Sequence, residues 1–120
     1  MKRLASFATA AVVLVAAFAA MQWWTSQAQV RQGRQMKALA APGDIQMISS
    51  QTCVYCTAAR RWMTEHGVAF NECFIETDAS CADLYKATLS RGTPTLIVRG
   101  QLQLGFSPPQ VLQRLEQPGG

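Results

Sequence analysis

The chain has 120 residues, of which 49% are hydrophobic and 15% charged, and its formal net charge is +4. That length allows one compact domain and an appendage. All the excess positive charge precedes Asp44; from Asp44 onward, six basic residues face seven acidic ones. The predicted domain is therefore close to neutral. This argues against a nucleic-acid-binding surface, which requires basic residues gathered on the fold.

The N-terminal segment reads as a membrane or export signal. The basic start Met1-Lys2-Arg3 is followed by the apolar stretch Leu4–Trp24, which ends in two tryptophans. This is about the length that a transmembrane helix requires, and tryptophan is typical of the membrane interface. The alternative is a cleaved signal peptide, with small-residue sites at 17–19 or 26–28. We therefore predict a signal anchor or a signal peptide over residues 1–24.

Basic residues flank the apolar stretch on both sides in nearly equal number. The positive-inside rule therefore does not decide its orientation in the membrane. We expect the domain to lie outside the cytoplasm, because N-terminal signals usually export the rest of the chain and because the chain has four cysteines. The predicted location is a single-pass inner-membrane protein with its domain in the periplasm. Release into the periplasm after cleavage is the alternative.

We predict a linker over residues 25–43, either a tether or a frayed helix, then a domain over 44–116 and a frayed tail over 117–120. Hydrophobic periodicity in the domain predicts the order β-α-β-α-β-β-α. The predicted strands are 45–49, 68–76, 95–98 and 102–106, and the predicted helices are 54–66, 80–91 and 108–116.

Local sequence signals predict where several of these elements begin, turn or face the core. Ser80 and Asp83 predict a capped start for the second helix, and Ser107 with Gln110 predicts a capping box for the last one. Gly100-Gln101 predicts a two-residue hairpin turn. One apolar face is predicted on the second helix, formed by Cys81, Leu84, Tyr85, Thr88 and Leu89. Leu102, Leu104 and Phe106 alternate along the fourth predicted strand.

Cys53 and Cys56 lie where the first predicted strand passes into the first predicted helix. Free backbone N–H groups and the helix dipole favour an anion at a helix start. A thiolate is such an anion and is the nucleophilic form of cysteine, so this position lowers a cysteine pKa and makes the residue reactive. Cys56 follows one turn later, placed to resolve a mixed disulfide. The pair predicts thiol–disulfide exchange, with both cysteines catalytic.

The segment Thr52-Cys53-Val54-Tyr55-Cys56 resembles the active site of glutaredoxins, whose usual form is Cys-Pro-Tyr-Cys. The spacing to Thr93-Pro94 matches the cis-proline loop of that family. Gly105-Phe106-Ser107-Pro108 resembles the segment after the last strand in the glutaredoxin-like redoxins that serve ribonucleotide reductase. The resemblance covers Asp44–Glu116. It implies a thioredoxin-like α/β fold, in which helices flank a mixed four-stranded sheet.

The resemblance also implies roles for individual residues. Tyr55 would border the substrate groove, Pro94 would shape it, and the backbone of Thr93 would pair with an extended substrate strand. No prosthetic group or metal is expected, since the cysteines are themselves the redox centre. Two glutathione anchors of the family are missing: Ser50 stands where many glutaredoxins have lysine, and Gly105–Pro108 lacks the second glycine and the acid. The sequence therefore does not predict specific glutathione binding, although glutathione use stays open.

Cys73 and Cys81 depart from the simple family pattern. In an exported chain they would form a structural disulfide that closes a small loop. Two buried free thiols, or a second redox pair, are the alternatives. Zinc is disfavoured, since the four cysteines lack the second close pair of a zinc ribbon. An iron–sulfur cluster is disfavoured because glutaredoxins that hold one usually keep only the first cysteine.

We therefore expect a membrane-tethered thiol–disulfide oxidoreductase that acts on protein thiols and exchanges electrons with a membrane relay partner. One alternative is a non-catalytic module that holds a client protein or a soft metal. The others are a redoxin facing the cytoplasm and an exported glutathione-dependent enzyme. The single histidine, His66, is expected at the end of the first domain helix in a structural or solvent-facing role.

Overall fold

The computed structural model describes residues 1–117, so most of the predicted tail, residues 118–120, lies outside the described residues. The first helix, α1, spans Lys2–Leu39. The chain forms two compact units, Met1–Arg31 and Gln32–Gly120. Within residues 1–117, α1 is the one helix that is long and apolar enough to cross a membrane, and a signal sequence would meet the same criteria.

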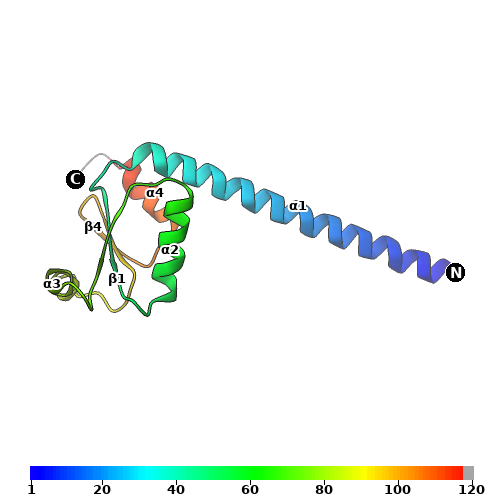
Figure 1. The fold of residues 1–120 in the computed structure, drawn as a ribbon. Helices are drawn as coiled ribbons and strands as arrows, with labels where there is room; N and C mark the ends of the chain where they lie inside the picture. Colours follow the sequence, from blue (N-terminus) through cyan, green and yellow to red (C-terminus); the bar gives the residue numbers. More distant parts are fainter. Residues whose placement is uncertain (118–120) are drawn as a thin grey trace. The chain divides into compact units, whose positions relative to one another are not determined.

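The second unit contains the predicted mixed sheet (Figure 1). Its strands are β1 (Ile45–Ser49), β2 (Asn71–Phe74), β3 (Thr95–Val98) and β4 (Gln101–Leu104). They lie in the order β2-β1-β3-β4. Strand β1 runs parallel to β2 and antiparallel to β3, and β3 runs antiparallel to β4. The predicted thioredoxin-like order of elements is confirmed.

Three helices cover the two faces of this sheet unequally. Helices α2 (Val54–Glu65) and α4 (Pro108–Glu116) lie on one face, and α3 (Ala79–Ala87) lies beside the other (Figure 1). The core fills the space under α2 and α4, because alternate residues of β1 and β3 point to that side. Its fully buried members include Met47, Leu96, Val98, Met63, Val111 and Leu115.

The segment predicted as a linker is helical to Leu39, and its second half packs into the core. Met36 is fully buried, and Ala40, the residue after the end of α1, belongs to the same core cluster. Gly33 is also buried, because its missing side chain leaves room for the ring of His66. The compact unit therefore begins at Gln32, earlier than the predicted boundary at Asp44.

The β3–β4 hairpin turns one residue earlier than predicted. Its two turn residues are Arg99 and Gly100, with φ of 47° and 81°, and Val98 pairs with Gln101. Positive φ at both central positions fits the twist of an antiparallel hairpin. Along β4 it is Gln103 that is buried, whereas Leu102 and Leu104 face outward. The predicted alternation of Leu102 and Leu104 thus marks the outward face of this strand.

Helix α3 also differs from its prediction. Asp78, not Ser80 or Asp83, is the N-cap residue, and its carboxylate accepts from the N–H groups of Ser80 and Cys81. The Ser80 hydroxyl also donates to this carboxylate and lowers the pKa of Asp78. The helix ends at Ala87, and Cys81 is its one fully buried residue.

The bounds of one strand and the cap of one helix also differ from the prediction. Strand β2 covers only Asn71–Phe74 of the predicted 68–76. At α4 the proline at the first helical position is present, but Ser107 makes no side-chain capping bond. Pro109 carries no N–H, so Gln110 would be the donor to such a bond, and the Ser107 side chain does not accept from it.

Candidate functional site

The two predicted catalytic cysteines form a disulfide at the start of α2, with their Cα atoms 5.2 Å apart. Cys53 is the N-cap residue, and its Sγ accepts a hydrogen bond from the N–H of Cys56 at 3.1 Å. Cys53 is half-buried and Cys56 is completely buried. The exposed sulfur is therefore the one that a substrate can reach, and a helix-start N–H already points at it.

The Thr93–Pro94 loop lies directly against this pair. The peptide bond between the two residues is cis, and the Thr93 carbonyl oxygen lies 3.3 Å from Cys53 Sγ. In the disulfide this sulfur has no proton, so only the reduced thiol could donate to that carbonyl. Pro94 is buried, and its carbonyl accepts from the N–H of Gly105 at 2.8 Å. The structure thus brings together the residues expected to form the groove.

Hydrogen bonds from hydroxyl groups hold the residues next to the Thr93–Pro94 loop. Thr95 Oγ1 donates to the Gly92 carbonyl at 2.7 Å and lies 2.5 Å from Ser90 Oγ. Thr95 is almost fully buried, so these bonds satisfy a hydroxyl that has no access to water. Sequence patterns gave no signal for this support, because it joins residues on a turn to the first residue of a strand.

Val54 and Tyr55 are the most exposed part of the site. Each has 78% of its surface accessible, although valine is apolar and tyrosine is aromatic. They stand between the two cysteines on the first turn of α2. Their exposure fits the expectation that this turn borders a groove open to a partner.

The turn that leads into Cys53 is held by Glu76, a residue that no sequence motif singles out. The hydroxyl of Ser50 and the N–H of Gln51 both donate to its carboxylate. The bond from Ser50 lowers the pKa of Glu76. Glu76 lies on the segment after β2, so only the fold brings it to this turn.

Cys73 and Cys81 form a second disulfide, between β2 and the first turn of α3, with Cα atoms 5.9 Å apart. All four cysteines of the chain are thus paired. Within residues 1–117, no group of three or more His, Cys, Asp or Glu side chains is arranged to hold a metal ion.

His66 and Arg60 take structural positions. The His66 ring stacks on Trp62 with centroids 4.1 Å apart, and its Nδ1 lies 2.7 Å from the Trp62 carbonyl oxygen. Arg60 forms a two-pronged ion pair with Glu72, at 2.6 and 2.8 Å, which raises the pKa of the guanidinium. Ser49 donates to the same carboxylate. This network links α2 to two strands and was not predicted.

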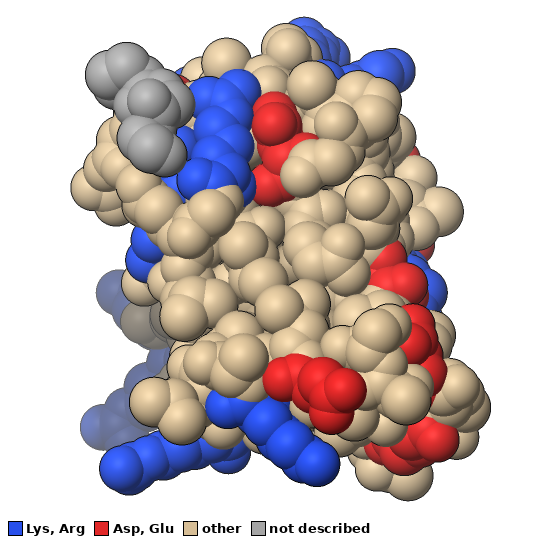
Figure 2. All heavy atoms as spheres, turned by 90° about the vertical axis from the view of Figure 1, so that its left-hand side faces the viewer, with Lys and Arg blue, Asp and Glu red and all other residues tan. Residues whose placement is uncertain are grey.

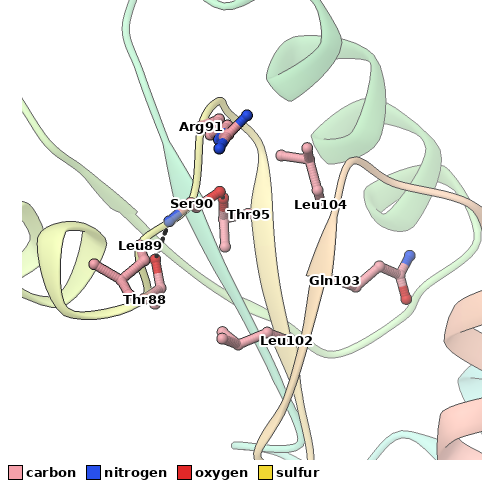
Figure 3. A pocket seen from close by; sticks show the side chains of 8 residues that line it. All are labelled: Thr88, Leu89, Ser90, Arg91, Thr95, Leu102, Gln103 and Leu104. Atoms are coloured by element: carbon pink, nitrogen blue, oxygen red, sulfur yellow. Dashed lines mark hydrogen bonds between the residues drawn. The ribbon is translucent and has the colours of Figure 1, made fainter.

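A hollow of about 300 Å³ lies on the α3 side of the sheet, behind the Thr93–Pro94 loop. Leu89, Leu102 and Leu104 border it, while Gln103 points away (Figure 3). Leu89, expected on the apolar face of the second helix, is 86% exposed and lies beyond the end of α3. The middle of the face on this side of the molecule carries few charges (Figure 2).

The geometry of the CxxC pair agrees with comparisons to known proteins. The family model named Glutaredoxin matches residues 45–103, which include both catalytic candidates and the Thr93–Pro94 loop. This part of the chain is a glutaredoxin-family domain. It is a thioredoxin-fold redox domain with a CxxC pair at Cys53 and Cys56.

Solved structures share the fold of this glutaredoxin-family domain. The thioredoxin-like protein BC3987 (mutant T8A) is 24% identical, with a TM-score of 0.55 over 61% of this chain and 95% of its own. NrdH-redoxin from Escherichia coli is 24% identical, with a TM-score of 0.51 over 63% of this chain and 97% of its own. A glutaredoxin from Archaeoglobus fulgidus is 15% identical, with a TM-score of 0.51 over 62% and 87%. No curated protein sequence matches the chain.

Proposed function

We propose that the protein is a membrane-tethered thiol–disulfide oxidoreductase that exchanges disulfides with protein thiols outside the cytoplasm. The observation that carries the proposal is the half-buried Cys53 sulfur at the start of α2, which accepts from the N–H of Cys56 and faces the Thr93 carbonyl. The N–H donor would stabilise a thiolate at this position. Beside it, the exposed side chains of Val54 and Tyr55 offer a surface that a protein partner could contact.

In the reaction, the Cys53 thiolate attacks one sulfur of a substrate disulfide and the other substrate sulfur leaves as a thiolate. Cys56 then attacks the Cys53 sulfur and releases the second substrate thiol. Two electrons pass from the cysteine pair to the substrate, and the reverse sequence oxidises a substrate dithiol. A membrane redox partner would reset the pair after each cycle. The Thr93 carbonyl beside Cys53 would give an extended substrate strand a hydrogen-bond acceptor.

Two features support a location outside the cytoplasm. The apolar part of α1 could act as an anchor or an export signal. All four cysteines are paired, including Cys73–Cys81, which lies away from the CxxC turn. Structural disulfides persist mainly in oxidising compartments.

The experiment that tests the chemistry uses the full chain in a non-ionic detergent with a disulfide-containing protein. The Cys56→Ser variant should accumulate a mixed disulfide through Cys53, because the resolving sulfur is missing, and mass spectrometry should locate it. The Cys53→Ser variant should form none. A Cys56→Ser chain that forms no adduct with any protein disulfide would favour a non-catalytic module instead.

Two measurements then set the direction and the compartment. A titration of Cys53–Cys56 in glutathione buffers to a potential above about −230 mV would indicate oxidation or isomerisation, whereas a value near roughly −270 mV would indicate a reductant. Labelling of Cys53 by a membrane-impermeant maleimide in intact cells carrying Cys56→Ser should match labelling in permeabilised cells. Labelling that requires permeabilisation would contradict the extracytoplasmic location.

A further inference from the structure

The turn that leads into the CxxC pair carries a negative charge held in a fixed place. The N–H of Gln51 lies 3.1 and 3.2 Å from the two carboxylate oxygens of Glu76, and the Ser50 hydroxyl donates to the same group. The N–H of Cys53 closes this turn by donating to the Ser50 carbonyl at 3.2 Å. The Glu76 carboxylate is therefore fixed to a residue only two positions before the attacking cysteine.

No salt bridge within residues 1–117 includes this carboxylate. Among the described residues, the ion pairs are Arg60–Glu72 and Arg99–Asp44, and neither includes Glu76. Glu76 is exposed. Its pKa is lowered by the Ser50 hydroxyl, so the carboxylate stays charged through the neutral range. A molecule that approaches Cys53 thus meets, on the adjoining turn, a carboxylate that forms no salt bridge among the described residues.

We propose that Glu76 is a specificity-determining residue that makes the site prefer disulfides with positive charge near the sulfur over anionic ones. The favoured substrate class is a protein disulfide flanked by Lys or Arg, and the disfavoured class includes glutathione disulfide. A fixed charge attracts or repels a charged reactant as it approaches, and so changes its rate of encounter. Glu76 touches no reacting atom. This inference rests on the proposed function.

The test compares three small disulfides in a single turnover: cystamine, which is cationic, hydroxyethyl disulfide, which is neutral, and glutathione disulfide, which is anionic. The reduced full chain in non-ionic detergent is mixed with each, quenched with acid and alkylated. Formation of Cys53–Cys56 is then followed by mass. In Glu76→Gln the ratio of the cystamine rate to the glutathione disulfide rate should fall about threefold or more at low ionic strength. The ratio in the unmodified chain should shrink as salt is added.

The chain offers a matched control. Glu65→Gln makes the same change of charge at an exposed residue that ends α2, a whole helix away from Cys53, and should leave the ratio unchanged. Glutamine at 76 keeps an oxygen that can accept from Ser50 and Gln51. Arg61, which lines a shallow hollow with Val54, is present in every variant, so its charge does not enter the comparison.

The outcomes separate this inference from the proposed function. Equal changes in the rates of all three disulfides would mean that Glu76 only holds the turn, and would overturn the inference. So would a ratio that Glu76→Gln leaves unchanged. Failure of the unmodified chain to react even with hydroxyethyl disulfide would overturn the proposed function itself. A fall in the ratio with the neutral rate preserved is the expected result.

Discussion

At the scale of single residues, the contact between Gly33 and His66 explains how a polar-looking helix end packs against the domain. A Cβ atom placed on Gly33 would overlap the imidazole ring and would lie 2.9 Å from the Cβ of His66. The ring cannot easily move away, because it stacks on Trp62 and its Nδ1 is bonded to the Trp62 carbonyl. Glycine is therefore required here for space, and not for an unusual backbone angle.

We predict that Gly33→Ala destabilises the domain, although alanine is the better helix former by about 1 kcal/mol. Overpacking against the fixed ring should cost about 1–3 kcal/mol, which outweighs that gain. Denaturant unfolding followed by near-UV circular dichroism measures the difference. The double variant Gly33→Ala/His66→Ala is the control, since removing the ring should make the alanine tolerable. If Gly33→Ala unfolds at a higher denaturant concentration than the unmodified chain, the prediction that His66 leaves no space for a side chain at position 33 is contradicted.

At the scale of elements, α3 is the helix with the least burial in the core. Cys81 is its one fully buried residue, and Leu84 remains 37% exposed. The helix is held at its start by the Asp78 cap and by the disulfide from Cys81 to Cys73. The chain then runs from α3 through Ser90 into the Thr93–Pro94 loop. The attachment of α3 is thus close in sequence to one wall of the active site.

We predict that Cys73→Ala/Cys81→Ala lowers the free energy of unfolding by about 2–3 kcal/mol, the chain-entropy value for so short a loop. Hydrogen exchange should rise first in α3, because the disulfide is its main link to the sheet. Amide exchange measured by mass spectrometry, with the Cys53–Cys56 pair kept oxidised, checks both effects. The Cys53→Ala/Cys56→Ala variant serves as a comparison that should leave exchange in α3 unchanged. Equal protection of α3 in the two variants would contradict its dependence on the second disulfide.

At the scale of the whole molecule, the compact unit that contains the glutaredoxin-family domain includes the end of α1 as part of its core. Met36 and Ala40 pack with residues from the sheet, α2 and α4. Arg99 reinforces this arrangement, because its guanidinium donates to the carbonyls of Leu39 and Leu115 and pairs with Asp44. One side chain thereby joins the ends of two helices to the start of the first strand.

We predict that a fragment of residues 32–120 keeps the stability of the domain, whereas a fragment of residues 44–120 loses much of it. The shorter fragment lacks the buried Met36, and emptying a site of that size costs about 2–5 kcal/mol. Denaturation midpoints of the two fragments, measured side by side, test this expectation. Equal midpoints would show that the N-terminal residues of the longer fragment add nothing to the core.

The sequence was most informative where chemistry is local. Three features depend only on neighbouring residues: the CxxC spacing, the Thr93-Pro94 dipeptide and the strand 95–98. In the structure the two cysteines are paired, the Thr93–Pro94 bond is cis and the strand has the predicted bounds. The alternation of Leu102 and Leu104 shows that the strand has two different faces, but not which face is covered. Met36 stands among glutamines and alanines with no strong periodicity. Glu76 and the contact of Gly33 with His66 depend on the fold, since their partners are distant in sequence.

The position at which the core begins has a consequence for maturation of the protein. Both candidate cleavage sites, at 17–19 and at 26–28, precede Gln32, where the compact unit starts. A signal peptidase that cut at either site would leave Gly33, Met36 and Ala40 on the product. The same core would thus be kept by an anchored form and by a released one, so a cell could change where this redox domain works by proteolysis, without changing how it folds.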